Sequence, residues 1–574
     1  MGIKLEEFWL NQDINVFFAD GNQQSSFKYS DGDKTEERIY NIIKNARDLS
    51  IFSDELIEQI YDWPTEYHFS PLRHNLLRHF EFKSTDRILE LGCGCGAITR
   101  QLGETGAAIT AIEGSKQRAK CASSRTRDLP NVNVYCSDFQ KISFDNQFNY
   151  VTLIGVLEYS TIFFSEEDPL KACLEIIKSA LKPDGKLIIA IENRLGLKYF
   201  MGYSEDHGGA PFSGIQDLYT NETAKTLGKE ELLVLLKQSN FENINFQYPF
   251  PDYKIPEVLF FESAFKSEKF SPSDIICQMT SRDYSRKTIP LFSENLVWPI
   301  IDSNKLISQL SNSFLVVASL NKQKEIDEQK VLGIKYTVDR KIEYNTRTEF
   351  IENDENNIIV KKKNIIISLV NNKEIKQELV TDDYYHGVNL DVQINKAIKS
   401  NNFAKFIDNI NLWINYIKTN AVKEYNSDNI YYSRVLPNYI DCIPRNLIIT
   451  QEGLKYIDRE WVLTKEFTLF TLIMRYINMI DPDFIDLHIK GLNQNSYDKL
   501  LNYLGIPFNH VLLKEVVAVQ EIIEQTFSKY RKQDRIFNHN SKQKRIIAKI
   551  LNKLPSSVKD MIVRVKRVFD NMYL

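Results

Sequence analysis

The chain lacks several features that would define whole classes of protein. Its seven cysteines among 574 residues are odd in number and scattered, which predicts a reducing, cytoplasmic compartment and excludes a disulfide-rich secreted scaffold. No basic and then apolar stretch opens the sequence, and no apolar run is long enough to cross a membrane, so we expect neither a secretion signal nor a spanning helix. A net charge of −4 gives no reason to expect a nucleic acid partner.

The composition describes a large globular protein. Hydrophobic residues make up 43% and charged residues 26% of the chain, which is too long for one domain; about three units are expected. Cys93 and Cys95 have no second pair of Cys or His at matching spacing. We therefore interpret them as small residues of a turn and predict no metal there.

The most informative segment is residues 87–100, where an apolar strand ends at Glu90 and Gly92, Gly94 and Gly96 follow. Glycines spaced in this way let backbone N–H groups approach a nucleoside with no Cβ in the way. A dinucleotide-binding oxidoreductase is the competing interpretation, because the glycines nearly satisfy that fingerprint too. Glu90 opposes it, since a carboxylate there would repel a pyrophosphate but attract the cationic amino acid end of S-adenosylmethionine.

The following segments agree with a methyl donor. Residues 107–113 read as a strand ending at Glu113, an acid that can accept hydrogen bonds from both ribose hydroxyls. After a third strand, Asp138 can bind the adenine amino group while Phe139 covers the ring. Further strands are expected at 148–154 and 186–191, and their alternation with helices predicts a parallel, doubly wound sheet.

Together these residues resemble the class I S-adenosylmethionine-dependent methyltransferases. The resemblance implies an α/β, Rossmann-like, seven-stranded domain with this cofactor. We expect a sixth strand that ends near Tyr248 and a seventh at 312–319. The domain would span residues 1–322, with an N-terminal helical cover over 1–82 and an inserted, mostly helical segment at about 255–310.

Two further regions are candidates for this first site. Tyr67 and Arg73 could contact the methionine part of the cofactor, although a surface helix with a solvated basic face is an equal alternative. The polar, glycine-rich residues 192–214 leave a strand end, where an α/β sheet binds its ligands, and we interpret them as the acceptor loop. Glu158, Asp206 and His207 are the candidate bases, each of which could instead have a structural role.

A second motif lies after a charged linker at 322–330. Asp441 and Asn446 have the spacing of a kinase catalytic loop, in which the acid orients an acceptor hydroxyl and the amide holds Mg²⁺. Asp458 follows a strand and would be the second metal ligand, although Arg459 and Glu460 stand where kinases have Phe and Gly. That departure argues against a protein kinase more than against phosphoryl transfer.

The upstream segment then has to supply an ATP-binding lobe. Residues 331–350 can form two strands, and the Val-x-Ile-Lys pattern favours Lys361 as the ATP-phosphate lysine, with Lys362 and Lys363 as alternatives. Glu374 or Glu378 would pair with it from a following helix, and residues 384–390 resemble a hinge. No glycine-rich nucleotide loop is visible, which leaves an inactive kinase open.

The order of the two motifs resembles bacterial bifunctional methyltransferase and kinase proteins that terminate O-polysaccharide chains. The resemblance implies a glycan or lipid-linked saccharide acceptor that is phosphorylated with ATP and Mg²⁺ and then methylated. The α+β kinase-like domain would span 328–528, with an N-lobe at about 328–385 and a C-lobe at about 386–528. The alternatives are a methyltransferase of sugar hydroxyls with an inert kinase-like clamp, and a non-enzymatic scaffold for glycosyltransferases.

The end of the chain is basic. Residues 529–574 contain 13 Lys and Arg against 3 Asp, and a helix after Pro555 would have one apolar and one basic face. Such a helix could lie on an anionic membrane surface, dock a partner such as a glycosyltransferase, or pack on its own domain. We prefer peripheral attachment to the inner face of the cell membrane.

Overall fold

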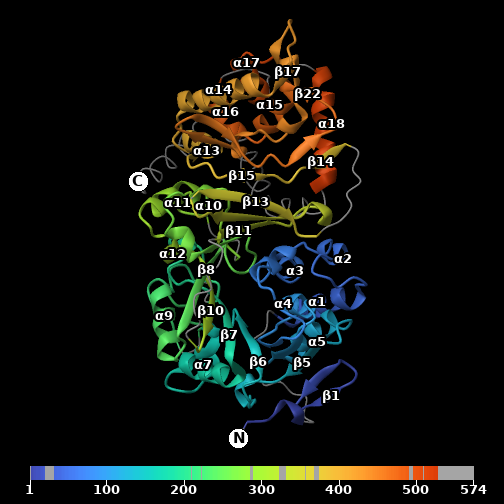
Figure 1. Ribbon diagram of the computed structural model, residues 1–574, viewed down its shortest axis with the longest axis vertical. Coiled ribbons are helices and arrows are strands. Elements are labelled where there is room, and N and C mark those ends of the chain that lie inside the picture. The colour runs from blue at the N-terminus through green and yellow to red at the C-terminus, as the bar shows by residue number, and fades with distance from the viewer. Residues whose placement is uncertain are drawn as a thin grey trace, which may run out of the picture.

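The computed structural model describes most of the chain (Figure 1). The described residues are 2–19, 32–207, 210–220, 223–284, 289–321, 331–355, 357–366, 374–489, 496–507 and 510–527. The predicted linker at 322–330 and the predicted basic tail lie outside these ranges. Within them, each helix is too short or too polar to cross a bilayer.

The first half of the chain is built on a mainly parallel sheet. Its central strand β3 has parallel neighbours on both sides, and β10 lies antiparallel between β7 and β8. From edge to edge, the seven predicted strands occur in the order β5, β4, β3, β6, β7, β10 and β8. Their bounds are β3 Arg87–Leu91, β4 Ala108–Glu113, β5 Val132–Cys136, β6 Phe148–Ile154, β7 Leu181–Glu192, β8 Asn243–Phe250 and β10 Ser313–Ser319.

Helices cover both faces of this sheet, and the alternation of side chains explains why. Ile88 packs with one hydrophobic core, which includes α4 and α5, whereas its neighbour Leu89 packs with a second core on the other face, which includes α7 and α9. Successive strand residues point to opposite faces, so apolar residues at every position demand cover on both sides. These helices are α4 Ala97–Gly103, α5 Lys116–Arg125, α7 Pro169–Ala180 and α9 Lys229–Gln238.

The N-terminal cover is not purely helical. A short hairpin, β1 (Trp9–Asn11) and β2 (Val16–Phe18), extends the sheet because β2 pairs in parallel with β5. Helix α1 (Asp33–Asn45) then packs on α5, and α2 (Asp54–Ile57) and α3 (Trp63–Phe69) follow. The prediction of a helical cover therefore missed the hairpin, whose three-residue strands are too short for periodicity to reveal.

The inserted segment contains helices and one strand. Strand β9 (Val258–Phe261) pairs with β8, and short helices follow it. The strand is buried, which its run of apolar residues explains, but it was not predicted. The helices of this half not yet placed are α6 Ser160–Phe163, α8 Leu197–Phe200, α10 Ser273–Ile276, α11 Glu294–Ser303 and α12 Ile307–Leu310.

The sheet continues past the predicted domain boundary. Strand β11 (Val331–Thr337) pairs with β9, so that four more antiparallel strands bring the sheet to fourteen within the described residues. Two residues of β11 belong to the hydrophobic cores of the first half: Leu332 packs in one core and Ile334 in the other. In Figure 1 these yellow strands lie beside the green α10 and α11 and below the orange helices. The other three strands are β12 Thr346–Glu352, β13 Ile358–Asn364 and β15 Thr381–Asp383.

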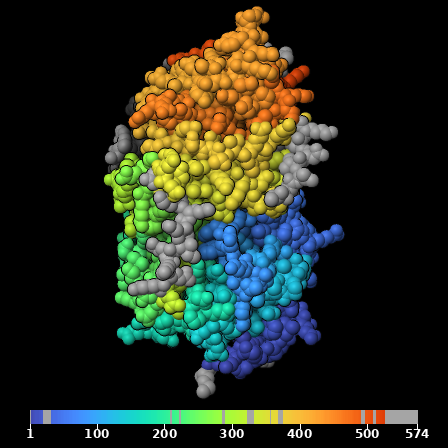
Figure 2. Space-filling view, viewed as in Figure 1, coloured from blue at the N-terminus to red at the C-terminus, as the bar shows by residue number. Residues whose placement is uncertain are grey.

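The remaining residues form a mainly helical unit with its own hydrophobic core. We call this unit, together with strands β11, β12, β13 and β15, the C-terminal region. In Figure 2 the orange surface of this unit is joined to the blue and green surface by the yellow band of residues near 331–400. Its helices are α13 Leu390–Lys399, α14 Phe403–Asn420, α15 Leu469–Ile477, α16 Pro482–His488, α17 Ser496–Tyr503 and α18 His510–Phe527. Its strands are β14 Ile375–Gln377, β16 Val388–Asn389, β17 Val422–Glu424, β18 Arg434–Val435, β19 Leu447–Thr450, β20 Gly453–Tyr456, β21 Trp461–Leu463 and β22 Phe467–Thr468.

Candidate functional sites

The turn after β3 has the backbone that its glycines predict. Gly94 has φ +55° and a Cβ added there would meet no atom within 4 Å, so the space above it is open. Gly96 has φ +84°, and a Cβ there would lie 2.7 Å from the Cα of Ala122 on α5. Gly92 also has a positive φ. The turn therefore presents bare backbone toward an open space, which fits a nucleoside cradle.

Glu113, at the end of β4, holds this turn. Its Oε2 accepts a hydrogen bond from Gly94 N at 2.8 Å, and its Oε1 accepts one from Ser115 N at 2.9 Å. The carboxylate is buried, and burial raises its pKa. Each oxygen still has a second lone pair, so ribose hydroxyls could donate to it as predicted.

Asp138 lies at the end of the next strand. It begins a short 3₁₀ helix, where its Oδ1 accepts a hydrogen bond from Gln140 N at 3.0 Å. The adjacent Ser137 donates its backbone N–H to Glu113 O, which ties the ends of β5 and β4 together. Asp138 and Phe139 are both half-buried. The structure thus brings the predicted adenine residues to the same sheet edge as Glu113.

Glu90 is buried at the end of β3, with one oxygen, Oε2, that has no hydrogen-bond partner in the described structure. Burial raises the pKa of this carboxyl to about 7. A buried carboxylate without a partner is costly unless a ligand or cation satisfies it. The residue therefore fits the cationic end of S-adenosylmethionine.

Arg73 is buried rather than part of a solvated face. Its Nη1 donates to the carbonyl oxygens of Tyr253 at 3.1 Å and Lys254 at 3.2 Å. Its guanidinium lies 4.6 Å from the ring centre of Tyr67 and 5.7 Å from that of Tyr253. The surface-helix alternative for these residues is therefore wrong, and Arg73 links the N-terminal cover to the segment after β8.

Three side chains of the acceptor region form a buried cluster. Glu158 lies in a short 3₁₀ helix after β6, Glu192 ends β7, and His207 lies in the loop that follows. His207 Nε2 is 3.1 Å from Glu192 Oε2 and 3.6 Å from Glu158 Oε1, and His207 Nδ1 is 2.8 Å from Tyr159 Oη. The structure thus brings two of the predicted bases together, beside Glu192.

Asp206 does not face this cluster as a free base. Its Oδ2 lies 2.7 Å from the Nζ of Lys198 and 2.7 Å from that of Lys254, and Lys254 also pairs with Glu192. Lys198 is 3.8 Å from Asp252, which also accepts hydrogen bonds from the hydroxyl of Tyr284 at 2.6 Å and from Lys254 N at 2.9 Å. The structure makes Asp206 a counterion of two buried lysines and contradicts its prediction as a base.

Burial and neighbouring charges shift the protonation of the cluster. Burial raises the pKa of Glu158 to about 8, and the charge of Glu192 adds to this. Burial would also raise the pKa of Glu192, but Lys254 and His207 hold it well below its ordinary value. Burial would lower the pKa of His207, but Glu192 raises it above the ordinary value. The two carboxyl groups therefore differ sharply in acidity.

A second set of polar side chains lines a cavity of about 130 Å³ in the C-terminal region. Lys362 of β13 forms an ion pair with Asp458, and its Nζ lies 3.3 Å from Glu460 Oε2. The other oxygen of Glu460, Oε1, lies 2.6 Å from the guanidinium of Arg340. Burial would raise the pKa of Asp458, but Lys362 holds it well below its ordinary value. Asn446 lines the same cavity, so the structure brings together a lysine, an acid and an amide.

Two predictions for this region are wrong. Lys361 is exposed and does not line the cavity, because neighbouring residues of a strand point to opposite faces; Lys362 takes its place. Glu374 and Glu378 are not on a helix, since β14 runs between them and pairs with β21. The carboxylate beside the lysine comes instead from Asp458 and Glu460.

Asp441 lies next to Asn446, as the spacing predicts. Asn446 Nδ2 donates to Asp441 Oδ2 at 2.9 Å and to its backbone oxygen at 2.9 Å. Arg475 of α15 lies 3.2 Å from Asp441 Oδ1. The acid is therefore held by an amide and a guanidinium beside the cavity rather than within its lining.

The first half of the chain contributes a wall to this second cavity. Asp274, Ile275 and Gln278, from α10 and the residues after it, line it together with the C-terminal region. Asp274 Oδ2 accepts a hydrogen bond from Tyr384 Oη at 2.5 Å. Sequence reasoning missed this wall, because nothing in the local pattern of residues 273–278 indicates which surface they cover.

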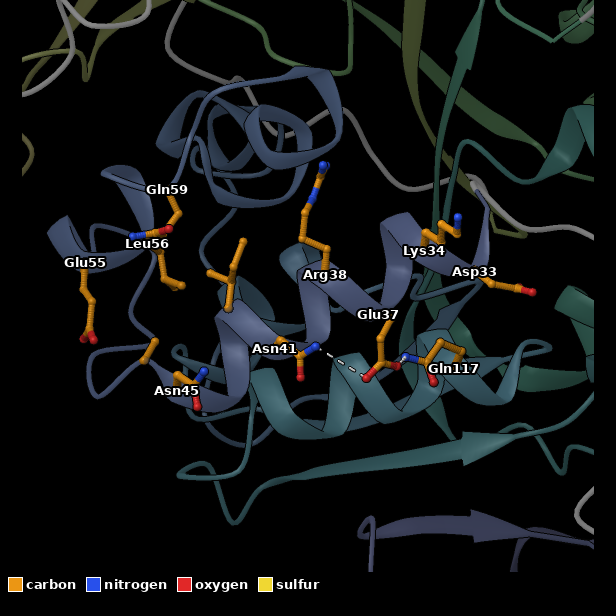
Figure 3. A pocket seen from close by; sticks show the side chains of 12 residues that line it. Asp33, Lys34, Glu37, Arg38, Asn41, Asn45, Glu55, Leu56, Gln59 and Gln117 are labelled. Atoms are coloured by element: carbon orange, nitrogen blue, oxygen red, sulfur yellow. Dashed lines mark hydrogen bonds between the residues drawn. The ribbon is translucent and has the colours of Figure 1, made fainter.

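A wider hollow of about 930 Å³ lies elsewhere, between α1, α2 and the start of α5. Figure 3 shows it lined by polar side chains, with Glu37 hydrogen-bonded to Asn41 and Gln117. None of the predicted site residues lines it. Its size therefore does not mark it as the chemical site.

Glu192 and Lys198 lie within the predicted acceptor loop, but neither they nor Tyr253 and Lys254 were predicted as site residues. Glu192 had a signal that could have revealed it, since it ends a buried strand as Glu113 does. The lysines had none, because their burial depends on acids far away in the sequence.

Comparisons with known proteins agree with the first site. Residues 89–189 match a family model described as a methyltransferase domain. Ubiquinone biosynthesis O-methyltransferase of Rickettsia bellii is 26% identical over 182 residues, which are 31% of this chain and 72% of the relative. Malonyl-[acyl-carrier protein] O-methyltransferase of Bacillus anthracis is 30% identical over 125 residues, 21% of this chain and 44% of the relative.

Solved structures of methyltransferases also match part of the chain. Phosphoethanolamine N-methyltransferase 2 of Haemonchus contortus is 17% identical, with a TM-score of 0.26, and the match covers 43% of this chain and 52% of that one. A methyltransferase of Aquifex aeolicus dependent on S-adenosylmethionine is 20% identical, with a TM-score of 0.24, and the match covers 33% and 89%. The chain thus spans about half of the nematode protein. The chain therefore contains an S-adenosylmethionine-dependent methyltransferase domain that includes residues 89–189.

Proposed function

We propose that this protein methylates the end of a bacterial surface polysaccharide, after its C-terminal region has phosphorylated that end with ATP and Mg²⁺. The methyl-transfer half rests on one observation above all. Glu90 and Glu113 end adjacent strands around an open glycine turn, and the buried cluster of Glu158, Glu192 and His207 lies at the same sheet edge. Methyl donor and acceptor would thus meet at the carboxyl ends of the parallel strands.

The residues of the first site would divide the work. S-adenosylmethionine would supply a methyl group bound to a positively charged sulfur. The acceptor would attack the methyl carbon in line with the carbon–sulfur bond, and the sulfur would leave as a neutral thioether. Glu113 and Asp138 would hold the nucleoside, and Glu90 would neutralise the cationic end. Alignment of the reacting atoms provides most of the rate in such a transfer. A hydroxyl acceptor would also lose its proton to the cluster of Glu158, Glu192 and His207, whereas a phosphate acceptor is already anionic.

The phosphorylation step is supported by the contents of the smaller cavity. Lys362, Asp458 and Asn446 combine a cation for ATP phosphates with two oxygen ligands for Mg²⁺. Asp441 would orient the glycan hydroxyl from its position beside Asn446. The sugar acceptor and the role in chain termination rest on the sequence resemblance, as does peripheral attachment to the membrane through residues 529–574.

The test uses the full chain with a lipid-linked saccharide, labelled S-adenosylmethionine and Mg-ATP. Mass spectrometry of the glycan end is expected to find both a phosphate and a methyl group. A methyl group that forms equally well without ATP would instead support a methyltransferase of sugar hydroxyls with an inert clamp. Glycan without either group, from protein that binds neither ligand, would favour the scaffold for glycosyltransferases.

A matched pair of variants assigns each group to its site. Glu113→Ala is expected to remove the methyl group and leave the phosphate in place. Asp458→Ala is expected to remove the phosphate, and with it the methyl group if phosphorylation comes first. Loss of both groups in Glu113→Ala protein that still binds ATP would contradict the proposed order.

A further inference from the structure

The cluster of Glu158, Glu192 and His207 has the geometry of a metal site. Each residue offers one ligand atom, and the three atoms lie within 4.8 Å of one another. They come from three separate segments, which follow β6, end β7 and lie in the loop after β7. An ion would therefore be held by three segments of the chain, of which one, at Glu192, is a strand end.

Glu158 provides an independent reason to expect a ligand. The residue is fully buried, and neither of its carboxylate oxygens has a hydrogen-bond partner within the described part of the chain. The nearest imidazole nitrogen, His207 Nε2, is 3.6 Å from Oε1, which is beyond hydrogen-bond distance. Leaving a carboxylate in this state is costly, and a cation bound between the three groups would satisfy it.

The other two side chains are oriented for the same task. Lys254 contacts Oε1 of Glu192, so that Oε2 remains directed toward His207. On the far side of the ring, His207 Nδ1 lies 2.8 Å from the hydroxyl oxygen of Tyr159. If Nδ1–H donates to this oxygen, Nε2 carries the lone pair and faces the cluster. Such an outer partner is typical of metal-binding histidines.

We propose that Glu158, Glu192 and His207 bind a divalent cation, with Mn²⁺ the best match to two carboxylates and one imidazole. Three protein ligands leave coordination positions open. The site lies at the strand ends where the acceptor of the proposed methyl transfer would bind, so an open position could hold an acceptor oxygen. That last consequence rests on the proposed function, whereas metal binding itself does not.

The test measures Mn²⁺ alone, with neither S-adenosylmethionine nor glycan. The full-length Asp458→Asn variant is used so that the second cavity, whose ligands would be oxygens, does not compete. Pulsed electron paramagnetic resonance of bound Mn²⁺ is expected to show coupling to one histidine nitrogen. A folded protein that binds no Mn²⁺, or binds it without nitrogen coupling, would overturn the proposal, whatever the fate of the methyl transfer.

Variants in the same background identify the nitrogen. His207→Gln is expected to abolish the coupling and to weaken Mn²⁺ binding more than about tenfold, since even outer-shell changes cost about 10- to 100-fold. Tyr159→Phe should keep the coupling but weaken binding by about tenfold. Glu166→Gln, at an exposed acid of the same region, is the charge control and should change neither. Coupling that survives His207→Gln would place the metal elsewhere and refute the site.

Discussion

The two candidate sites are assembled in different ways. The first takes its nucleoside residues from the ends of adjacent parallel strands, so that Glu90, Glu113 and Asp138 converge wherever this sheet forms. The second needs Lys362 from the shared sheet, Asp458 from a loop of the helical unit and a wall from α10 of the first half. A site built on one sheet edge depends on local pattern, whereas a site between units depends on how those units pack.

The largest effect is expected from Glu113→Ala, which should disrupt the first site and leave the second intact. Glu113→Ala removes the acceptor of the Gly94 amide and of both predicted ribose bonds. Each lost bond to a charged group costs about 1.5–3 kcal/mol, which predicts more than about hundredfold weaker binding of S-adenosylhomocysteine. Calorimetric titration measures this, with Asp441→Ala as the control that should bind normally. An affinity within threefold of the wild type would refute the role of Glu113.

A neighbouring pair of lysines tests the second site. Lys362→Met should weaken Mg-ATP binding by about 10- to 100-fold, because it removes a charged hydrogen bond to phosphate. Lys361→Met changes the same charge one residue away on the exposed side of the strand and should have no effect. Fluorescence titration with a labelled nucleotide measures both. Equal losses in the two variants would show that only net charge matters.

The pH dependence of the first site follows from Glu90. The pKa of Glu90 is raised to about 7, so its carboxyl group is mostly protonated below that pH. It must then lose its proton before it can pair with the cationic end of the cofactor. Affinity for S-adenosylmethionine should therefore fall below pH 7, by up to about tenfold per unit. In Glu90→Gln this dependence should disappear. A pH-independent affinity in the wild type would contradict the assigned contact.

The same raised pKa of Glu90 predicts that the stability of the folded protein changes with pH in the opposite direction to its affinity for the cofactor. Its folded-state pKa lies above its ordinary value of 4.5, so the folded protein binds the proton more tightly. Stability of the protein without cofactor should then fall as pH rises from about 4.5 to about 7, by on the order of 3 kcal/mol in all. Thermal unfolding across this range measures the fall, which Glu90→Gln should reduce. The site thus trades stability for cofactor binding.

The smallest effect sharpens the comparison between the sites. Gln278→Ala alters an exposed side chain of the first half that lines the second cavity. Loss of one neutral hydrogen bond predicts about two- to tenfold weaker nucleotide binding, with no change for S-adenosylhomocysteine. Gln216→Ala, another exposed amide of the first half, is the control. No difference between the two would mean that the residues after α10 only border the cavity.

The sequence predicts the strands around the first site because their information is local. All seven strands, with an acid at or after the end of three of them, follow from apolar runs and glycine spacing. What it could not predict were contacts set by distant residues. Lys198 and Lys254 are buried because Asp206, Asp252 and Glu192 surround them, and no pattern near either lysine indicates that partnership.

The second site shows where local pattern becomes ambiguous. Three consecutive lysines on one strand differ only in the face they occupy, and a shift of one residue selects a different one. The structure selects Lys362 through its pairing with Asp458. The strand β9 inside the insert was also not predicted. It pairs with β8 on one side and, on the other, with β11, which lies more than seventy residues further on.

The pairing of β9 with β11 has a consequence for how the chain is made. Until residues 331–337 leave the ribosome, the first half ends in an open strand whose Leu259 and Phe260 are fully buried in the finished protein. Such an apolar edge is a template for pairing with other chains. Protein truncated at residue 322 should therefore aggregate during expression, and the nascent first half would need a chaperone or rapid translation to pass this stage.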